Sequence, residues 1–379
     1  MKSSAVLAIL LSLSLGSESL GQAALVHPDE KNLTRRKPTT TLSRADSVST
    51  NPELNFLARR LRQAIRVDSI GDVDGDEASV LGTIMEVVVD SSGRVGVLDM
   101  AFQQLRIFSA AGRPAFIVGQ KGSGPMDFRF AVAAWVQSAG DFVVVDAVLG
   151  AKQLSLRDRQ SARLVRVTPL GADATGACGV GGSLVAYAPT TDPALTLTNT
   201  LHRYDSTGRL VRSFGDGYRA DSRLVTQMMS EGTVGCAPDG TVVAALSKLP
   251  FAQAFSEQGA LRWTTRFSSF TIGRELEEVD DRKRRSIGID PASPAHSYIR
   301  RIASIDRRFT AVQITLATLK SLRARESWAR LDTYLLDNAT GVGVFVSDRL
   351  PMLSGRSGDR VVGFENDPFP RVIFLRLSK

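Results

Sequence analysis

Residues that hold zinc or act as nucleophiles are scarce in this sequence. Its 379 residues include two cysteines and three histidines, which are His27, His202 and His296. Cys178 and Cys236 belong to no C-x-x-C motif and no Cys/His cluster, which argues against a structural zinc site. No histidine has a second histidine at metal-binding spacing or a G-x-S-x-G motif beside it, so triad and zinc hydrolase chemistry lack support.

Long apolar runs are also missing. The stretch Ala5–Leu15 covers about eleven residues, whereas a membrane-spanning helix needs about 20. Lys2 precedes this stretch, and Gly21-Gln22-Ala23 follows as a small-x-small cleavage site, so residues 1–23 are predicted to be a signal peptide. No cysteine follows that could carry a lipid anchor. We therefore expect a protein without a transmembrane segment that is exported to the periplasm or outside the cell.

Charge is plentiful but spread along the chain. The net charge is +8, with basic clusters at 282–285, 300–301 and 307–308. No aromatic residues are interleaved with these clusters as a base-stacking surface requires, so nucleic acid is not an expected partner. A solvated basic face is the favoured interpretation. The alternative is recognition of an anionic glycan or lipid surface through the segment 282–308.

Internal repeats define the fold. Glycine is frequent, at 32 residues, and a strand–turn–strand frame recurs around five of these glycines. The frame has apolar residues on both sides of the turn, and its fifth copy has one extra turn residue. The turn glycines are Gly93, Gly140, Gly182, Gly240 and, in the looser copy Leu336–Ser347, Gly341.

A second motif follows each of the first four turns and sets the repeat length. Its anchor residues Phe108, Leu156, Tyr204 and Phe255 are spaced 48, 48 and 51 residues apart. Two hairpins per repeat give four strands, which is the size of a propeller blade. The sequence therefore predicts an all-β fold, a single β-propeller of about six four-stranded blades, although five or seven blades also fit.

A propeller has to close, because an open ring leaves strand edges unpaired. Ile65–Ile70 is predicted to pair with Val372–Leu375 in the last blade. Leu54, Leu57, Leu61 and Ile65 have helical spacing, and Thr310–Leu319 reads as one alternating strand. The predicted organisation is a flexible leader at 24–51 and a propeller domain at 52–379. The domain includes a charged, partly helical insertion at about 275–308.

One loop resembles a known family. After Leu105–Phe108 and Gly112, the segment Gly119–Phe128 reads GQKGSGPMDF and resembles the inter-blade loop of NHL-type six-bladed propellers of exported bacterial proteins. Met126 replaces a glycine of that pattern. The resemblance extends over roughly residues 64–379 and implies the fold, with Gly119, Gly122, Gly124, Pro125 and Phe128 as structural loop residues. Members range from scaffolds to lyases and lactonases, so no function is implied.

Carboxylates supply the candidate chemistry. Asp99 and Asp146 stand six residues after the turn glycine in two blades, and Asp348 is similar if its turn is shifted. These residues could hold a divalent cation at the channel mouth. The favoured alternative is that they accept hydrogen bonds from backbone amides of the following turn. The acidic segment Asp72–Glu77 lacks the glycine and glutamate positions of a calcium loop, so it is interpreted as solvated.

Cys178 and Cys236 occupy equivalent frame positions in adjacent blades. They are predicted either to form a disulfide or to be small buried residues, since other blades have valine there. With no legible catalytic constellation, the sequence favours a monomeric, non-enzymatic binding or scaffold module. Its small-molecule or protein ligand docks on one end of the ring, and no cofactor is expected. The alternative is a metal-dependent lyase or lactonase using acidic residues such as Asp99 and Asp146.

Overall fold

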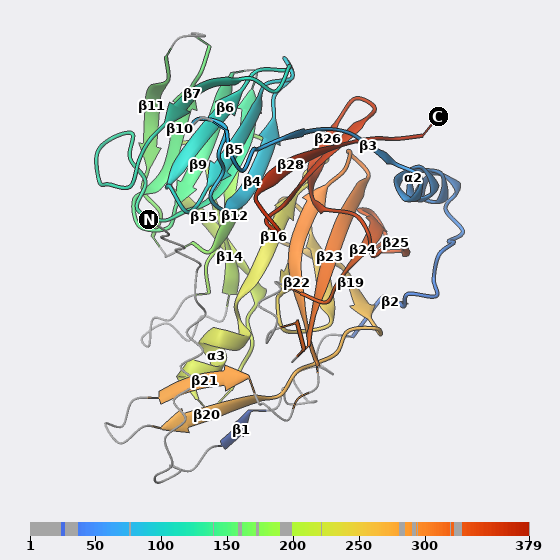
Figure 1. Cartoon of the computed structure of the whole chain (residues 1–379). Coiled ribbons are helices and arrows are strands. Elements are labelled where there is room, and N and C mark those ends of the chain that lie inside the picture. Colours follow the sequence, from blue (N-terminus) through green and yellow to red (C-terminus); the bar gives the residue numbers. More distant parts are fainter. Residues whose placement is uncertain are drawn as a thin grey trace.

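The chain forms a six-bladed β-propeller, as the repeat predicts (Figure 1). The structure is a computed structural model. It describes residues 24–26, 37–75, 77–138, 140–157, 161–171, 174–189, 199–220, 222–279, 285–289, 293, 295–318, 320–321 and 328–378. The predicted signal peptide and His27 lie outside these residues. Among the helices that are described, none is long and apolar enough to cross a membrane.

Blades 1–3 are antiparallel sheets of four consecutive strands. Blade 1 consists of β4 (Ile84–Val89), β5 (Val95–Asp99), β6 (Gln104–Phe108) and β7 (Pro114–Val118). Blade 2 consists of β8 (Ala131–Ser138), β9 (Asp141–Asp146), β10 (Gly150–Ser155) and β11 (Arg163–Thr168). Blade 3 consists of β12 (Gly176–Val180), β13 (Ser183–Tyr187), β14 (Asn199–Tyr204) and β15 (Leu210–Asp216).

Blades 4–6 have the same strand order. The first strand of each blade is the innermost one, as shown by the contacts that these six strands make with one another around the ring. Blade 4 consists of β16 (Gly232–Cys236), β17 (Val242–Leu246), β18 (Phe251–Phe255) and β19 (Leu261–Phe267). Blade 5 consists of β22 (Ala295–Ser304), β23 (Phe309–Thr318), β24 (Arg330–Asp337) and β25 (Gly343–Ser347). Blade 6 consists of β26 (Met352–Ser357), β27 (Arg360–Glu365), β28 (Arg371–Arg376) and β3 (Ile65–Ile70).

Strand β3 closes the ring as predicted. It pairs antiparallel with β28, with Ile70 opposite Val372 and Asp68 opposite Phe374. A strand that precedes blade 1 in the sequence therefore completes the last blade. This pairing removes the free edge that an open array would expose.

The repeat frame was misassigned at its fifth copy. Leu336–Ser347 contains the turn between β24 and β25, which are the third and fourth strands of blade 5, whereas Gly93 lies between the first and second strands of blade 1. The counterpart of Gly93 in blade 6 is Gly358, between β26 and β27. Six blades result all the same, because Leu336–Ser347 belongs to the fifth blade and one blade follows it.

The structure differs from the flexible leader expected at 24–51. Strand β2 (Thr40–Leu42) runs parallel to β19 and adds a fifth strand to blade 4. The Thr39 amide donates to the Thr264 carbonyl at 2.7 Å, and the Leu42 side chain is buried. The outer edge of blade 4 offers unpaired backbone groups, and this segment satisfies them.

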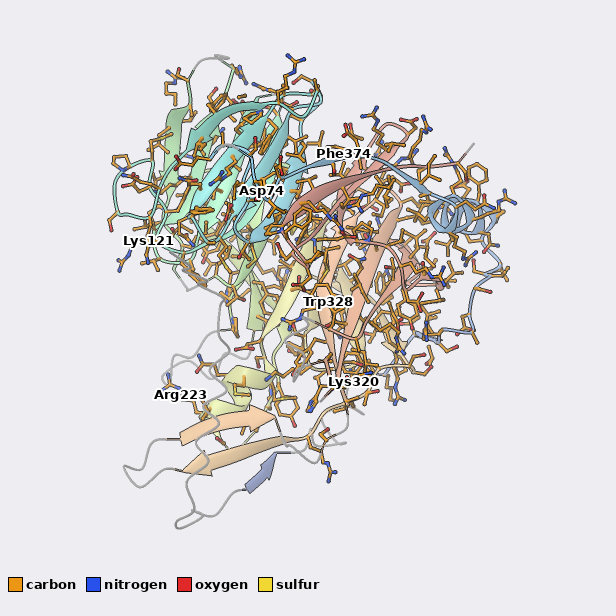
Figure 2. The ribbon with its side chains drawn as sticks, viewed as in Figure 1. Asp74, Lys121, Arg223, Lys320, Trp328 and Phe374 are labelled. Atoms are coloured by element: carbon orange, nitrogen blue, oxygen red, sulfur yellow. A yellow bond between two sulfur atoms is a disulfide. The ribbon has the colours of Figure 1, made fainter. Side chains whose placement is uncertain are left out.

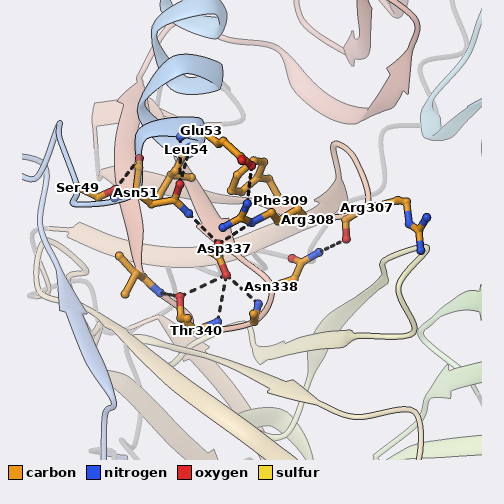
Figure 3. Close-up of polar contacts among 12 residues, drawn as sticks. Ser49, Asn51, Glu53, Leu54, Arg307, Arg308, Phe309, Asp337, Asn338 and Thr340 are labelled. Atoms are coloured by element: carbon orange, nitrogen blue, oxygen red, sulfur yellow. Dashed lines mark hydrogen bonds and ion pairs between the residues drawn. The ribbon is translucent and has the colours of Figure 1, made fainter.

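The predicted helix is present as α2 (Pro52–Arg62), with Leu54, Leu57 and Leu61 buried against blades 5 and 6. Ile65 was wrongly included, since it begins β3 and is exposed. Asn51 caps the helix by accepting from the Leu54 amide at 3.2 Å, and its amide group donates to Asp337 at 2.9 Å (Figure 3). This network attaches the helix to the outer loop of blade 5.

The charged insertion ends earlier than expected and is not helical where it is described. Strands β20 (Glu275–Val279) and β21 (Arg285–Ile289) form a hairpin that β1 (Ala24–Val26) extends to three strands. In Figure 1 this small sheet lies beside α3 (Arg223–Met229). Residues 295–304, assigned to the insertion from their charge, form the innermost strand β22 of blade 5.

Candidate functional site

The ring has two faces that differ in their loops. One face carries the loops that join successive blades and the loops between the second and third strands of each blade. We call it the inter-blade face. Figure 2 labels five residues of such loops, namely Asp74, Lys121, Arg223, Lys320 and Trp328, with Trp328 near the centre of the view. The opposite face carries the turns between first and second strands and between third and fourth strands. Candidate sites occur on both faces.

Asp99 and Asp146 lie on the inter-blade face, at the ends of β5 and β9. Asp99 is fully buried and accepts from the amides of Gly82, at 2.8 Å, and Thr83, at 3.1 Å. It also accepts from the Ala101 and Phe102 amides. This carboxylate therefore joins the loop before blade 1 to the loop between β5 and β6.

Asp146 does the same in blade 2. It accepts from the amides of Arg129, at 2.6 Å, and Phe130, at 2.9 Å, and from the amides of Val148 and Leu149, both at 2.8 Å. Burial by itself would raise the pKa of Asp146, but the four amides outweigh it and lower the pKa below its ordinary value. The equivalence of the two aspartates was read correctly from the repeat. Each one binds backbone amides, which is the favoured alternative from the sequence.

A metal ion needs further ligands. Within the described part of the chain, no group of three or more His, Cys, Asp and Glu side chains is close enough to hold a metal ion. Asp348 is not a third equivalent of Asp99, because it follows the outer strand β25 and forms an ion pair with Arg44 at 2.6 Å. In the acidic segment, Asp72 accepts from the Asp74 amide at 3.2 Å, and Asp76 lies outside the described residues.

The loops whose amides bind Asp99 and Asp146 expose apolar side chains. Phe102, Phe130 and Val148 are 44%, 43% and 55% exposed. Hydrogen bonds join the loops that carry these residues: the Ala131 amide donates to the Gln103 side chain at 2.9 Å, and the Ala147 amide donates to the Phe130 carbonyl at 2.9 Å. Asp99 and Asp146 thus stabilise loops of blades 1 and 2 that carry exposed apolar side chains.

Close packing and a buried ammonium hold the loop at 119–128. Gly119 has a φ of +80°, and a Cβ atom there would collide with the buried ring of Phe128. The buried Lys152 ammonium donates to the carbonyls of Gly124 and Asp127 and lies 5.4 Å from the centre of the Phe128 ring. Burial lowers the pKa of Lys152, and the nearby negative charges of Asp146 and Asp127 offset part of this decrease.

Cys178 and Cys236 form a disulfide, which was one of the two alternatives at these positions. They lie on β12 and β16, the innermost strands of blades 3 and 4, and their Cα atoms are 5.5 Å apart. The two sulfurs also line a cavity of about 370 Å³ on the opposite face. This cavity is one mouth of the central channel, because its walls come from the innermost strands of all six blades.

An ion pair that the sequence did not suggest crosses this mouth. Arg301 of blade 5 donates to the Glu86 carboxylate of blade 1 and to the Leu353 carbonyl of blade 6, the latter at 2.8 Å. Both charged side chains are mostly buried. Three blades therefore meet at one guanidinium. No local pattern marks these residues, since the partners are more than 200 positions apart in sequence.

A second pocket missed by the sequence lies on the inter-blade face between blades 5 and 6. Its volume is about 540 Å³. Trp328 and Phe364 supply aromatic walls, and Arg330, Arg349 and Asn366 supply polar groups. Asn366 is already used, because it accepts from the Ile84 amide at 2.9 Å and donates to the Ile84 carbonyl at 3.0 Å. The remaining lining residues are Ala329, Leu331, Asp348, Leu350, Pro351, Met352, Glu365, Asp367 and Pro368.

The described histidines are buried. His202 hydrogen bonds the Ala188 carbonyl through Nε2 at 2.9 Å and the Ser213 hydroxyl through Nδ1 at 2.8 Å. The carbonyl can only accept, so Nε2 carries the proton and Nδ1 accepts. Burial lowers the pKa of His202. His296 is buried on β22 beside Gly273.

Comparisons with known proteins add support for the fold. No known family matches the sequence, and no curated protein matches it. A crystal structure of a candidate exported protein from Bacteroides fragilis NCTC 9343 is similar, with a TM-score of 0.53 and 11% identity over 89% of this chain and 99% of that chain. A member of the DUF4221 family from Bacteroides vulgatus ATCC 8482 has a TM-score of 0.52 and 9% identity over 83% and 97%. At these identities, the likeness concerns the fold.

Proposed function

We propose that the protein is an exported, non-enzymatic binding module that holds a small organic ligand on its inter-blade face. The observation that carries this proposal is the pocket of about 540 Å³ beside Trp328. Ligand pockets usually measure about 300–1,000 Å³ and combine apolar walls with a few polar groups. The pocket between blades 5 and 6 has both properties.

Trp328 is the recognition group in this proposal. Its ring is partly buried against the core between blades 6 and 1. Within the described residues, its indole N–H has no hydrogen bond partner, so it is available to a ligand. The exposed Arg349 at the same pocket also has no ion pair partner among those residues. An aromatic ring with a free donor and a nearby cation suits a ligand with a flat or sugar-like ring and polar edges.

Export and family are the remaining parts of this proposal. The N-terminal Lys2, the apolar stretch Ala5–Leu15 and the cleavage site at Ala23 support export, and so does the description of the similar Bacteroides fragilis protein as a candidate exported protein. The loop Gly119–Phe128 supports NHL-type ancestry, since its glycine turn and buried Phe128 follow that pattern.

Tryptophan fluorescence tests the binding site. The probe set is a panel of mono- and disaccharides and aromatic carboxylic acids, titrated into the protein. We expect a compound that changes the emission of the wild type and of the control Trp135→Phe, but not of Trp328→Phe. Trp328→Ala should weaken its binding by about tenfold or more. Binding that is equal in wild type and Trp328→Ala would place the ligand elsewhere.

A further inference from the structure

Two consecutive arginines on the innermost strand of blade 5 have different surroundings. Arg301 uses its guanidinium fully within the protein. It donates to the Leu353 carbonyl at 2.8 Å, to the Ser354 hydroxyl at 3.1 Å and to the Met85 carbonyl at 3.3 Å, besides the Glu86 carboxylate. Arg301 is therefore a structural residue that joins three blades.

Arg300 has no such partners. Within the described residues, its guanidinium makes no hydrogen bond and no ion pair. It lies over the ring of Tyr298, 5.0 Å from the ring centre. The Glu231 carboxylate, just before β16, attracts it electrostatically. One face of the guanidinium is thus occupied by an aromatic ring, while its N–H donors are unused in the part of the chain that the structure describes.

The backbone explains why the two side chains differ. In the pairing of β22 with β23, Ile299 lies opposite Ile314 and Arg301 opposite Gln313, so Arg300 is the extra residue of a β-bulge. Bulges redirect a side chain and are frequent next to functional sites. At this bulge Arg300 is exposed, whereas Ile299 is buried and Arg301 is half-buried.

Arg300 lies on a strand that borders the central channel. Strand β22 pairs with β23 along one edge, and its other edge faces the ring axis. The Arg300 side chain is nevertheless exposed. Protein surrounds it closely enough for desolvation to lower its pKa. Because β22 is the innermost strand of its blade and Arg300 lies away from both of its ends, an exposed side chain at this position reaches the central channel.

We propose that Arg300 is an anion-binding residue of the central channel and takes the carboxylate or phosphate group of a small ligand. A guanidinium presents N–H donors that match an oxyanion in bidentate geometry, and the attraction is stronger where water is limited. Tyr298 holds the guanidinium plane and leaves its donors free. Glu231 opposes additional negative charge, so a singly charged carboxylate is expected to bind more tightly than a phosphate dianion.

Isothermal titration calorimetry with two probes tests this site. Sodium glucuronate and inorganic phosphate are titrated separately into the full chain, with ionic strength held constant by sodium chloride. We expect saturable binding of glucuronate near one equivalent and weaker binding of phosphate. Arg300→Gln should weaken glucuronate binding by about tenfold or more, as expected for lost hydrogen bonds to a charged group. Glu231→Gln should reduce the difference in affinity between glucuronate and phosphate.

The matched control is Arg212→Gln, which removes the same charge from an exposed arginine of the outer strand β15. It should bind both anions like the wild type. If Arg300→Gln fails to fold, Arg300→Lys tests the proposal instead, because lysine keeps the positive charge but lacks the bidentate donor geometry of a guanidinium. We expect its affinity for glucuronate to fall several-fold. Three outcomes would overturn the proposal: no saturable binding of either anion, equal affinity in the Arg300 variants, or equal loss in Arg212→Gln.

Discussion

Removal of the disulfide gives the most quantitative expectation. Cys178 and Cys236 are 58 positions apart in sequence, and their bond joins the innermost strands of blades 3 and 4. A cross-link that closes a loop of this length lowers the entropy of the unfolded chain, which corresponds to about 4 kcal/mol at 25 °C. Replacing both residues by alanine should therefore lower the free energy of unfolding by up to about that amount.

The assay is urea unfolding followed by far-UV circular dichroism. Three samples are compared: oxidised wild type, wild type with reductant, and Cys178→Ala/Cys236→Ala. We expect the last two to unfold at similar, lower urea concentrations, with a larger dependence on urea because their unfolded chains expose more surface. Reductant should not affect the double variant. Two titratable thiols in unfolded, unreduced wild type would refute the reasoning, as would a double variant that unfolds at the wild-type midpoint.

Two further predictions concern buried ionisable groups. Asp146→Ala leaves four loop amides without their acceptor and should destabilise the protein by about 2–3 kcal/mol. The control is Asp359→Ala, whose exposed carboxylate makes no hydrogen bond within the described residues and which should cost clearly less. Thermal unfolding of the two variants would contradict this expectation if their midpoints fell equally. His202 has a lowered pKa in the folded state, so its contribution to stability is present above the unfolded value of about 6.5 and is lost as the pH falls through the folded value. His202→Gln should flatten the loss of stability between pH 7 and 5, and an unchanged pH dependence would assign that loss to other groups.

The parts of the fold that depend on local signals were predictable. Turn glycines such as Gly93 adopt a positive φ, so their spacing reports the repeat directly. The pairing of β3 with β28 follows from the need to close the ring, and the alternating strand at Thr310–Leu319 agrees with β23. The same frame placed Asp99 and Asp146 at equivalent positions, and it placed the two cysteines at equivalent positions of adjacent blades while leaving their bonding open.

Other parts depend on contacts that leave no local pattern. Strand β22 carries His296, Arg300 and Arg301 and was assigned to a charged insertion, because an innermost strand beside the central channel does not show the apolar alternation of a buried strand. The segment Thr40–Leu42 has the composition of a flexible leader, and its pairing with β19 depends on an edge more than 200 residues away. The pocket at Trp328 combines loops of two blades, so its parts are recognisable only once the blades are placed.

Blade 6 combines strands from both ends of the propeller domain, and this constrains the order of events during synthesis. Its partner strands β3 and β28 are separated by about 300 residues, so β3 emerges long before its partner exists. A growing chain can assemble blades 1–5 in turn, but it forms an open arc until β28 is complete. The unfinished arc exposes strand edges that invite pairing with other chains, and the danger lasts for most of translation. A chain that stops short of β28 should consequently aggregate, even though it contains five complete blades.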